Sequence, residues 1–223
     1  MSLDFERDGV AVRDAVIGAD ILGKLADEFE EAGVRIGARP FALSPVIRGL
    51  LAPSGILTLL ARHWARGPAR PVRVLAFDKT PDANWHLPWH QDRVIAVKKR
   101  ADVPGFGNWT VKSGQHHVEA PAELLATMSN LRLHIDDCDA ANGALKVVPG
   151  SHERGRLTDA EVRDTARQGR AITCPVAAGG VLAMKALTIH ASDASSTPRR
   201  RRVLHVDYCA GELPKELDWA LEV

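Results

Sequence analysis

Residues 85–92, Trp85-His-Leu-Pro-Trp-His-Gln-Asp92, contain a His-x-Asp triplet at His90 and Asp92. On an extended chain the side chains of residues i and i+2 point to the same face, so this imidazole and this carboxylate could bind one ion. A second histidine from a distant strand, for which His190 is the candidate, would complete a set of two histidines and one carboxylate. Such a set is typical of non-haem Fe(II), because it leaves positions open for oxygen and a co-substrate.

The triplet alone is a weak signal, because the chain holds two more, at residues 134–136 and 205–207. The last has no downstream histidine and cannot open a triad in this chain order. The second could use His190, but a strand that leads into the turn-like residues 139–143 explains it without chemistry. The tryptophans and proline around His90 favour the first triplet as the mouth of a site, over the alternative of a surface-loop histidine beside an acid.

Residues 189–208 predict a strand, a turn-rich loop and a second strand, which together indicate a hairpin. In the second strand the alternation places Arg201 with Val203 on a polar inner face, and Leu204 with Tyr208 on an apolar outer face. Arg201 could therefore bind a carboxylate through two hydrogen bonds, one strand away from His190. The other arginines of residues 199–202 are interpreted as a solvated basic run at the hairpin tip.

These residues, with Asn142-Gly143 and Val148-Pro-Gly-Ser-His152, resemble the phytanoyl-CoA dioxygenase family from about residue 77 to residue 208. The family's order is kept and the spacing is similar. The resemblance implies an oxygenase that depends on Fe(II), 2-oxoglutarate and O2. Such an enzyme would hydroxylate an unactivated C–H of a small organic substrate and release succinate and CO2.

The resemblance also assigns roles to individual residues. It implies that the catalytic metal ligands are His90, Asp92 and His190. Arg201, assisted by Ser192, would bind the far carboxylate of 2-oxoglutarate.

Two more positions are implied contacts of the co-substrate. Arg132 stands where the family often has a tryptophan beside 2-oxoglutarate, so the inner wall of this pocket departs from the family pattern. Leu75 falls where the family has another co-substrate contact.

Two other functions fit the same residues. A cupin-type metalloenzyme that does not use 2-oxoglutarate would keep the three ligands without needing Arg201. A non-catalytic binding module would keep the fold but need neither.

Length and composition indicate one domain over residues 1–223, with an ordinary apolar share of 45%. The net charge of +1 gives no electrostatic reason to expect nucleic acid or a membrane surface as partner. Three cysteines without CxxC spacing favour a reduced, cytoplasmic protein over a disulfide framework. No signal peptide or long apolar run is apparent. The sequence leaves the oligomeric state open.

Residues 1–70 are expected to form a helical support, with a strand at 9–13 and helices at 19–32 and 53–66. Short strands and turns dominate residues 71–210, among them 72–77, 171–176 and a strand over 181–190 that delivers His190. Asn142-Gly143 predicts a hairpin between strands 131–136 and 144–148. Together with the resemblance, this indicates an α+β domain with a mainly β core, a double-stranded β-helix (jelly roll, cupin-like) with N-terminal helices packed on one sheet.

Residues 93–130 are interpreted as a long loop that forms an active-site lid, because loops of this length in compact domains are usually functional or disordered. Phe106 and Trp109 argue against disorder. These two residues and His117 are the candidate substrate contacts, with a plain surface position as the alternative for the histidine.

Overall fold

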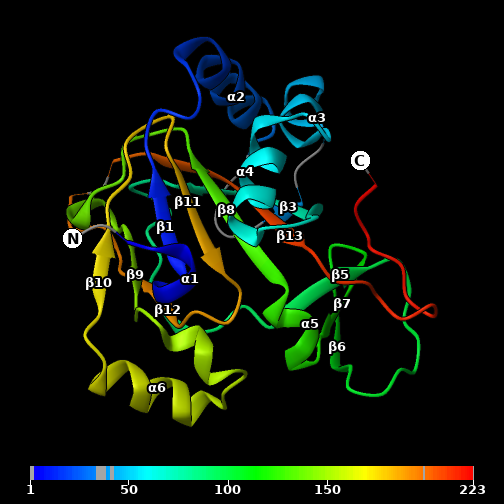
Figure 1. Cartoon of the computed structure of the whole chain (residues 1–223). Helices are drawn as coiled ribbons and strands as arrows, with labels where there is room; N and C mark the ends of the chain where they lie inside the picture. Colours follow the sequence, from blue (N-terminus) through cyan, green and yellow to red (C-terminus); the bar gives the residue numbers. More distant parts are fainter. Residues whose placement is uncertain (1–2, 34–38, 41–42, 198, 223) are drawn as a thin grey trace.

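Three antiparallel sheets form the core of the fold (Figure 1), in a computed structural model that describes residues 3–33, 39–40, 43–197 and 199–222. The largest sheet has the order β1 (Val10–Arg13), β11 (Val181–Lys185), β8 (Met128–His134), β13 (Arg201–Cys209), β3 (Arg70–Lys79) and β2 (Arg39–Pro40). The second has the order β10 (Ile172–Cys174), β9 (Leu145–Val147), β12 (His190–Ser192) and β4 (Leu87–His90). The third has the order β5 (Val94–Val97), β7 (Gln115–Glu119) and β6 (Gly107–Lys112).

The first two sheets face each other as the halves of a jelly roll. Leu145 and Val147 of the four-stranded sheet share a buried cluster with Val10 and Leu182 of the six-stranded sheet. The sheets remain separate ladders and do not close into a barrel. The predicted mainly β jelly-roll core is therefore confirmed.

The N-terminal helices cover the outer face of the six-stranded sheet (Figure 1), as predicted. These helices are α2 (Ala19–Glu31), α3 (Pro45–Leu51) and α4 (Ile56–Ala65), while the short α1 (Phe5–Asp8) precedes β1. Leu25 and Phe29 of α2 are fully buried in one cluster with Leu204 and Tyr208 of β13. The helix predicted from residue 53 begins only at Ile56.

Strand alternation separates this apolar face from a polar interior. The outward residues of β13 join the cluster beneath the helices, whereas Arg201 and His205 lie on the other face. In register with them on β3 are Lys79 and Leu75, and His205 also pairs with Arg132 on β8. Polar and charged side chains of β13 thus face the space between the two main sheets, as the alternation predicted, beside apolar ones such as Leu75.

Both predicted hairpins around the site are wrong. Strands β8 and β9 lie in different sheets, and so do β12 and β13. Residues 135–144 instead cross from one sheet to the other, and this crossing contains a short 3-10 turn, Ala140–Asn142, that ends at Gly143. The described residues 193–197 likewise leave the four-stranded sheet after β12. The strand predicted over 181–190 is likewise split, because residues 186–189 cross between β11 and β12. The sequence pattern of strand, turn and strand is the same in both cases: when the second strand pairs with the first in one sheet, and when it lies in the opposite sheet.

Two of the three remaining arginines of the basic run are not free on the surface. Arg200 pairs with the buried carboxylate of Asp78 at 2.7 Å, and Arg202 pairs with Asp136 at the same distance. Their side chains are 35% and 15% exposed. Arg199 also pairs with an acid, Asp139, but its side chain is 55% exposed, so the solvated interpretation holds for this arginine alone.

Residues 93–130 are not a long loop. They form β5, β6, β7 and the helix α5 (Ala122–Ala126), which enclose a second apolar cluster with Trp219. Ser113 and Gly114, with φ of 50° and 77°, make the tight turn between β6 and β7. Residues 159–168 form the helix α6 (Asp159–Gln168), and Ser151–Arg154 forms a 3-10 turn.

Candidate metal centre

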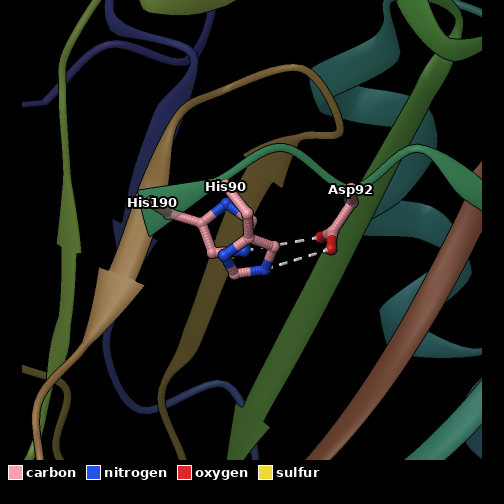
Figure 2. A group of neighbouring side chains, drawn as sticks. All are labelled: His90, Asp92 and His190. Carbon is pink, nitrogen blue, oxygen red and sulfur yellow. Dashed lines mark ion pairs between the residues drawn. The ribbon is translucent and has the colours of Figure 1, made fainter. Parts of the chain in front are cut away.

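The three predicted metal ligands converge between the two main sheets (Figure 2). His90 at the end of β4 and His190 at the start of β12 are direct register partners, with ring centroids 4.1 Å apart. Asp92 follows β4, and its carboxylate oxygens lie 3.8 Å from His90 Nε2 and 3.7 Å from His190 Nε2. One ligand atom from each residue lies within 4.8 Å of the others. Within the described part of the chain, this is the one group of three or more such side chains that could hold a metal.

Backbone carbonyls orient both imidazoles toward this point. His90 Nδ1 lies 2.8 Å from the carbonyl of Pro88, and His190 Nδ1 lies 2.9 Å from that of Thr188. Each Nδ1 therefore donates, which leaves the lone pair of Nε2 directed at the common point. Such second contacts are what fix the tautomer of a metal-binding histidine.

The carboxylate is positioned from both sides. Asn130 Nδ2 donates to Asp92 Oδ2 at 3.0 Å, and the Asp92 amide donates to the carbonyl of Ala186 at 3.0 Å. Burial raises the pKa of the Asp92 carboxyl, but the imidazoles of His190 and His90 and the guanidinium of Arg132 together hold that pKa well below its usual range. Burial also lowers the pKa of His190 well below its usual range. A charged carboxylate and a neutral imidazole are the forms that bind a metal ion.

Gln91, between the two ligands, was missed by the sequence reasoning. Its side chain is only 4% exposed and points away from the ligands. Its Nε2 donates to the carbonyls of Gly155 at 2.8 Å and Leu187 at 2.7 Å, and its Oε1 accepts from the Leu157 amide at 2.9 Å. Gln91 thus ties the triplet to two other loops. The alternation gave one clue, since a residue between two inward side chains must face the other way.

Arg201 and Ser192 come together at the far end of the same interior. Arg201 Nη1 and Ser192 Oγ both donate to the carbonyl of Gly143, the latter at 2.8 Å. Arg201 is buried, its Nε has no hydrogen-bond partner, and no described carboxylate lies within ion-pair distance. A buried guanidinium in this state is suited to an anionic ligand. The donor set and this cation without an acidic partner fit Fe(II) and a dicarboxylate co-substrate.

Arg132 lies against the metal ligands. Its Nη2 is 3.4 Å from His190 Nε2 and 3.8 Å from Asp92 Oδ2, while its Nε donates to Asn130 Oδ1 at 3.2 Å. Arg132 also lines a cavity of about 40 Å³ whose wall includes Ser192 and Arg201. Arg132 therefore lies between the metal ligands and the cavity at Arg201.

The other candidate residues lie elsewhere. Leu75 and His117 line a separate cavity of about 160 Å³ at the β3 end of the third sheet. Phe106 and Trp109 pack against the second apolar cluster, where the Arg100 guanidinium lies 5.7 Å from the Trp109 ring. Their roles as substrate contacts, and the role of residues 93–130 as a lid, stay predictions.

The two competing triplets do not form ligand sets in the described structure. His134 faces the interior, where burial and the cations Arg201 and Arg132 lower its pKa to about 3. Asp136, the carboxylate of this second triplet, points to the opposite side, toward Arg202. In the third triplet the two side chains bond to each other, with His205 Nε2 2.7 Å from Asp207 Oδ1.

The chain belongs to the phytanoyl-CoA dioxygenase family. The profile of Phytanoyl-CoA dioxygenase (PhyH) matches residues 5–203, which confirms the resemblance seen in the sequence. Among curated proteins no relative matches. None of the helices in the described ranges is long and apolar enough to cross a membrane.

Solved structures share the fold at low sequence identity. AviO1 from Streptomyces viridochromogenes Tue57 is 24% identical, with a TM-score of 0.66 over 95% of this chain and 94% of its own. The α-ketoglutarate-dependent epimerase SnoN from nogalamycin biosynthesis, in complex with Fe3+, α-ketoglutarate and nogalamycin RO, is 21% identical, with a TM-score of 0.67 over 92% of this chain and 80% of its own. The carbocyclase SnoK from nogalamycin biosynthesis is 17% identical, with a TM-score of 0.68 over 92% of this chain and 81% of its own.

Proposed function

We propose that this chain is an Fe(II)- and 2-oxoglutarate-dependent oxygenase that acts on a small organic molecule. The observation that carries the proposal is the pairing of two features in one interior. One is the His90, Asp92 and His190 set, whose ligand atoms lie within 4.8 Å of one another. The other is the buried Arg201, which has no acidic partner among the described residues.

In this proposal the three ligands hold the iron, which supplies the activation of O2 coupled to the oxidative decarboxylation of 2-oxoglutarate. The protein contributes positions and a site from which water is largely excluded. Arg201 and Ser192, which already share the Gly143 carbonyl, bind the far carboxylate of 2-oxoglutarate.

Arg132 would contact the end of 2-oxoglutarate that lies nearer the metal. Its guanidinium is 3.4 Å from His190 Nε2, so it is within reach of a carboxylate placed beside this ligand. Leu75, on the inner face of β3, would give an apolar contact. Phe106, Trp109 and His117 are proposed to contact the substrate, which requires the third sheet to approach the mouth of the site.

We propose C–H hydroxylation as the reaction, with release of succinate and CO2. The structural neighbours include an epimerase and a carbocyclase, so the shared fold does not by itself select the outcome. No described group forms a nucleophile–base pair beside the ligands, and hydroxylation needs none from the protein.

Reconstitution tests this function against its two alternatives. The protein with Fe(II) and ascorbate should convert 2-oxoglutarate to succinate, and a cupin-type enzyme that does not use 2-oxoglutarate would form none. His90→Ala should lose metal, whereas His86→Ala, which changes an exposed histidine of the same segment, should keep it. Unchanged metal content in His90→Ala would favour a non-catalytic binding module.

A further inference from the structure

Lys79 lies beside the proposed carboxylate anchor and has no part in the function described so far. It is the last residue of β3 and the direct register partner of Arg201 on β13. The residue is only 1% exposed. Lysine is rarely buried to this extent, because the ammonium group loses its hydration.

The ammonium of Lys79 is held by two backbone carbonyls and by the face of the Trp85 ring, whose centroid lies 5.2 Å from Nζ. Its Nζ donates to the carbonyls of Trp85 at 2.9 Å and Asp193 at 2.8 Å. An ammonium has three N–H donors, so one has no oxygen acceptor in the described ranges. The Asp193 carboxylate raises the pKa of Lys79 through its charge, but its ion pair is with Lys146, at 2.7 Å.

Lys79 and Arg201 face the same point beside Gly143. A Cβ atom built on this glycine would lie 3.1 Å from Lys79 Nζ and 3.6 Å from Arg201 Nη1. Burial and the charge of Arg201 lower the pKa of Lys79 to about 8. Two adjacent buried cations without an acidic partner are costly in the free protein, and an anion bound between them would relieve that cost.

We propose that Lys79 is a second cationic contact for the far carboxylate of 2-oxoglutarate, so that Arg201 and Lys79 hold this group together. The inference rests on the proposed function and adds a residue to it. A carboxylate offers two oxygens and can accept hydrogen bonds from both cations at once. The pair would select keto acids that carry a second carboxylate over monocarboxylates such as 2-oxobutyrate.

A purely structural role is the competing explanation, because Lys79 also joins the loop at Trp85 to the crossing at Asp193. Calorimetry with the Mn(II)-loaded protein separates the two roles. In Lys79→Met the dissociation constant for 2-oxoglutarate should rise roughly 10- to 100-fold, the loss expected for one charge-assisted hydrogen bond. Mn(II) affinity should not change. Lys146→Met, which removes a lysine that contacts Asp193 from the other side, should bind 2-oxoglutarate as the wild type does.

The pH profile gives a readout that a structural role would not move. The groups facing Lys79 are Arg201 on β13, the Cys138 thiol from the first crossing and Asp193 after β12. Wild-type affinity for 2-oxoglutarate should fall as the pH rises above about 8, where the ammonium of the free protein loses its proton. This decrease in affinity should be absent in Lys79→Met. It should persist in Cys138→Ser, because burial raises the pKa of the Cys138 thiol and so keeps the thiol protonated to a higher pH than usual.

The outcomes distinguish this inference from the function on which it rests. If wild type binds 2-oxoglutarate but Lys79→Met binds it equally well, the second contact is wrong and the oxygenase proposal stands. If wild type does not bind 2-oxoglutarate, both are wrong. If Lys79→Met does not fold, the wild-type profile decides, since an unchanged affinity between pH of about 7 and about 9.5 rules out a titrating lysine.

Discussion

Replacing Gln91 by leucine tests whether the residue between the ligands sets their position. Leucine is close to glutamine in size but cannot form hydrogen bonds. The substitution would therefore leave the carbonyls of Gly155 and Leu187 and the amide of Leu157 without this partner. Each lost bond in a buried place costs about 1 kcal/mol, so the free energy of unfolding should fall by about 3 kcal/mol.

For a chain of this length, about 3 kcal/mol corresponds to a decrease of roughly 6–12 °C in the melting temperature. Circular dichroism of the metal-free protein measures that decrease. The dissociation constant for Mn(II) should also rise roughly 10- to 100-fold, as for other residues that orient metal ligands. Gln168→Leu, which changes an exposed glutamine at the end of α6, is the matched control and should alter neither quantity.

The predicted loss of stability and the predicted loss of Mn(II) affinity can be refuted independently. A melting temperature within about 2 °C of wild type would mean that the three bonds contribute little to stability, contrary to their burial. A clear loss of stability with unchanged Mn(II) affinity would refute the positioning role alone.

Four further substitutions test other parts of the structure. Arg201→Met should weaken 2-oxoglutarate binding roughly 100-fold by calorimetry without lowering the melting temperature of the free protein, because it removes a buried charge that has no acidic partner among the described residues. Arg132→Met should tighten Mn(II) binding several-fold in the absence of 2-oxoglutarate, since the guanidinium competes for Asp92; weaker binding would contradict this. Leu204→Ala should reduce the free energy of urea unfolding by about 2–5 kcal/mol, because the side chain is fully buried beneath the helices. The last prediction concerns Lys79, whose pKa of about 8 in the folded state lies below its ordinary value of 10.5. The unfolded chain binds more protons between these values, so this residue should make the free protein more stable as the pH rises from about 8 to about 10.5, by up to about 3 kcal/mol relative to Lys79→Met.

The sequence predicted the parts of the site that depend on local alternation. The period of two along a strand sorted Arg201 from Leu204 without knowledge of the partner strands. The His90 and Asp92 triplet could be preferred over that at residues 134–136 from its aromatic surroundings. The structure gives the physical reason, since β8 ends at His134 and the chain then turns Asp136 outward.

Pairing between strands could not be predicted in the same way. Asn142-Gly143 has the composition of a hairpin turn, yet Gly143 (φ 72°) ends a crossing between sheets. Whether this turn closes a hairpin or crosses between sheets depends on residues distant in sequence. One of them is Asp193, whose carbonyl would lie 2.7 Å from a Cβ at Gly143. Lys79 was missed for a simpler reason: the predicted strand stopped at Phe77, and two more residues would have placed this lysine on the inner face.

The carbonyl of Gly143 accepts hydrogen bonds from Ser192 in the four-stranded sheet and from Arg201 in the six-stranded sheet. Neither half of the jelly roll can therefore assemble this anchor by itself. A chain that has folded only one half should be unable to retain a keto acid, so oxidation would start only after both halves have docked. Binding of 2-oxoglutarate would then indicate that the chain is completely folded. The bound keto acid would also slow the separation of the two halves of the jelly roll.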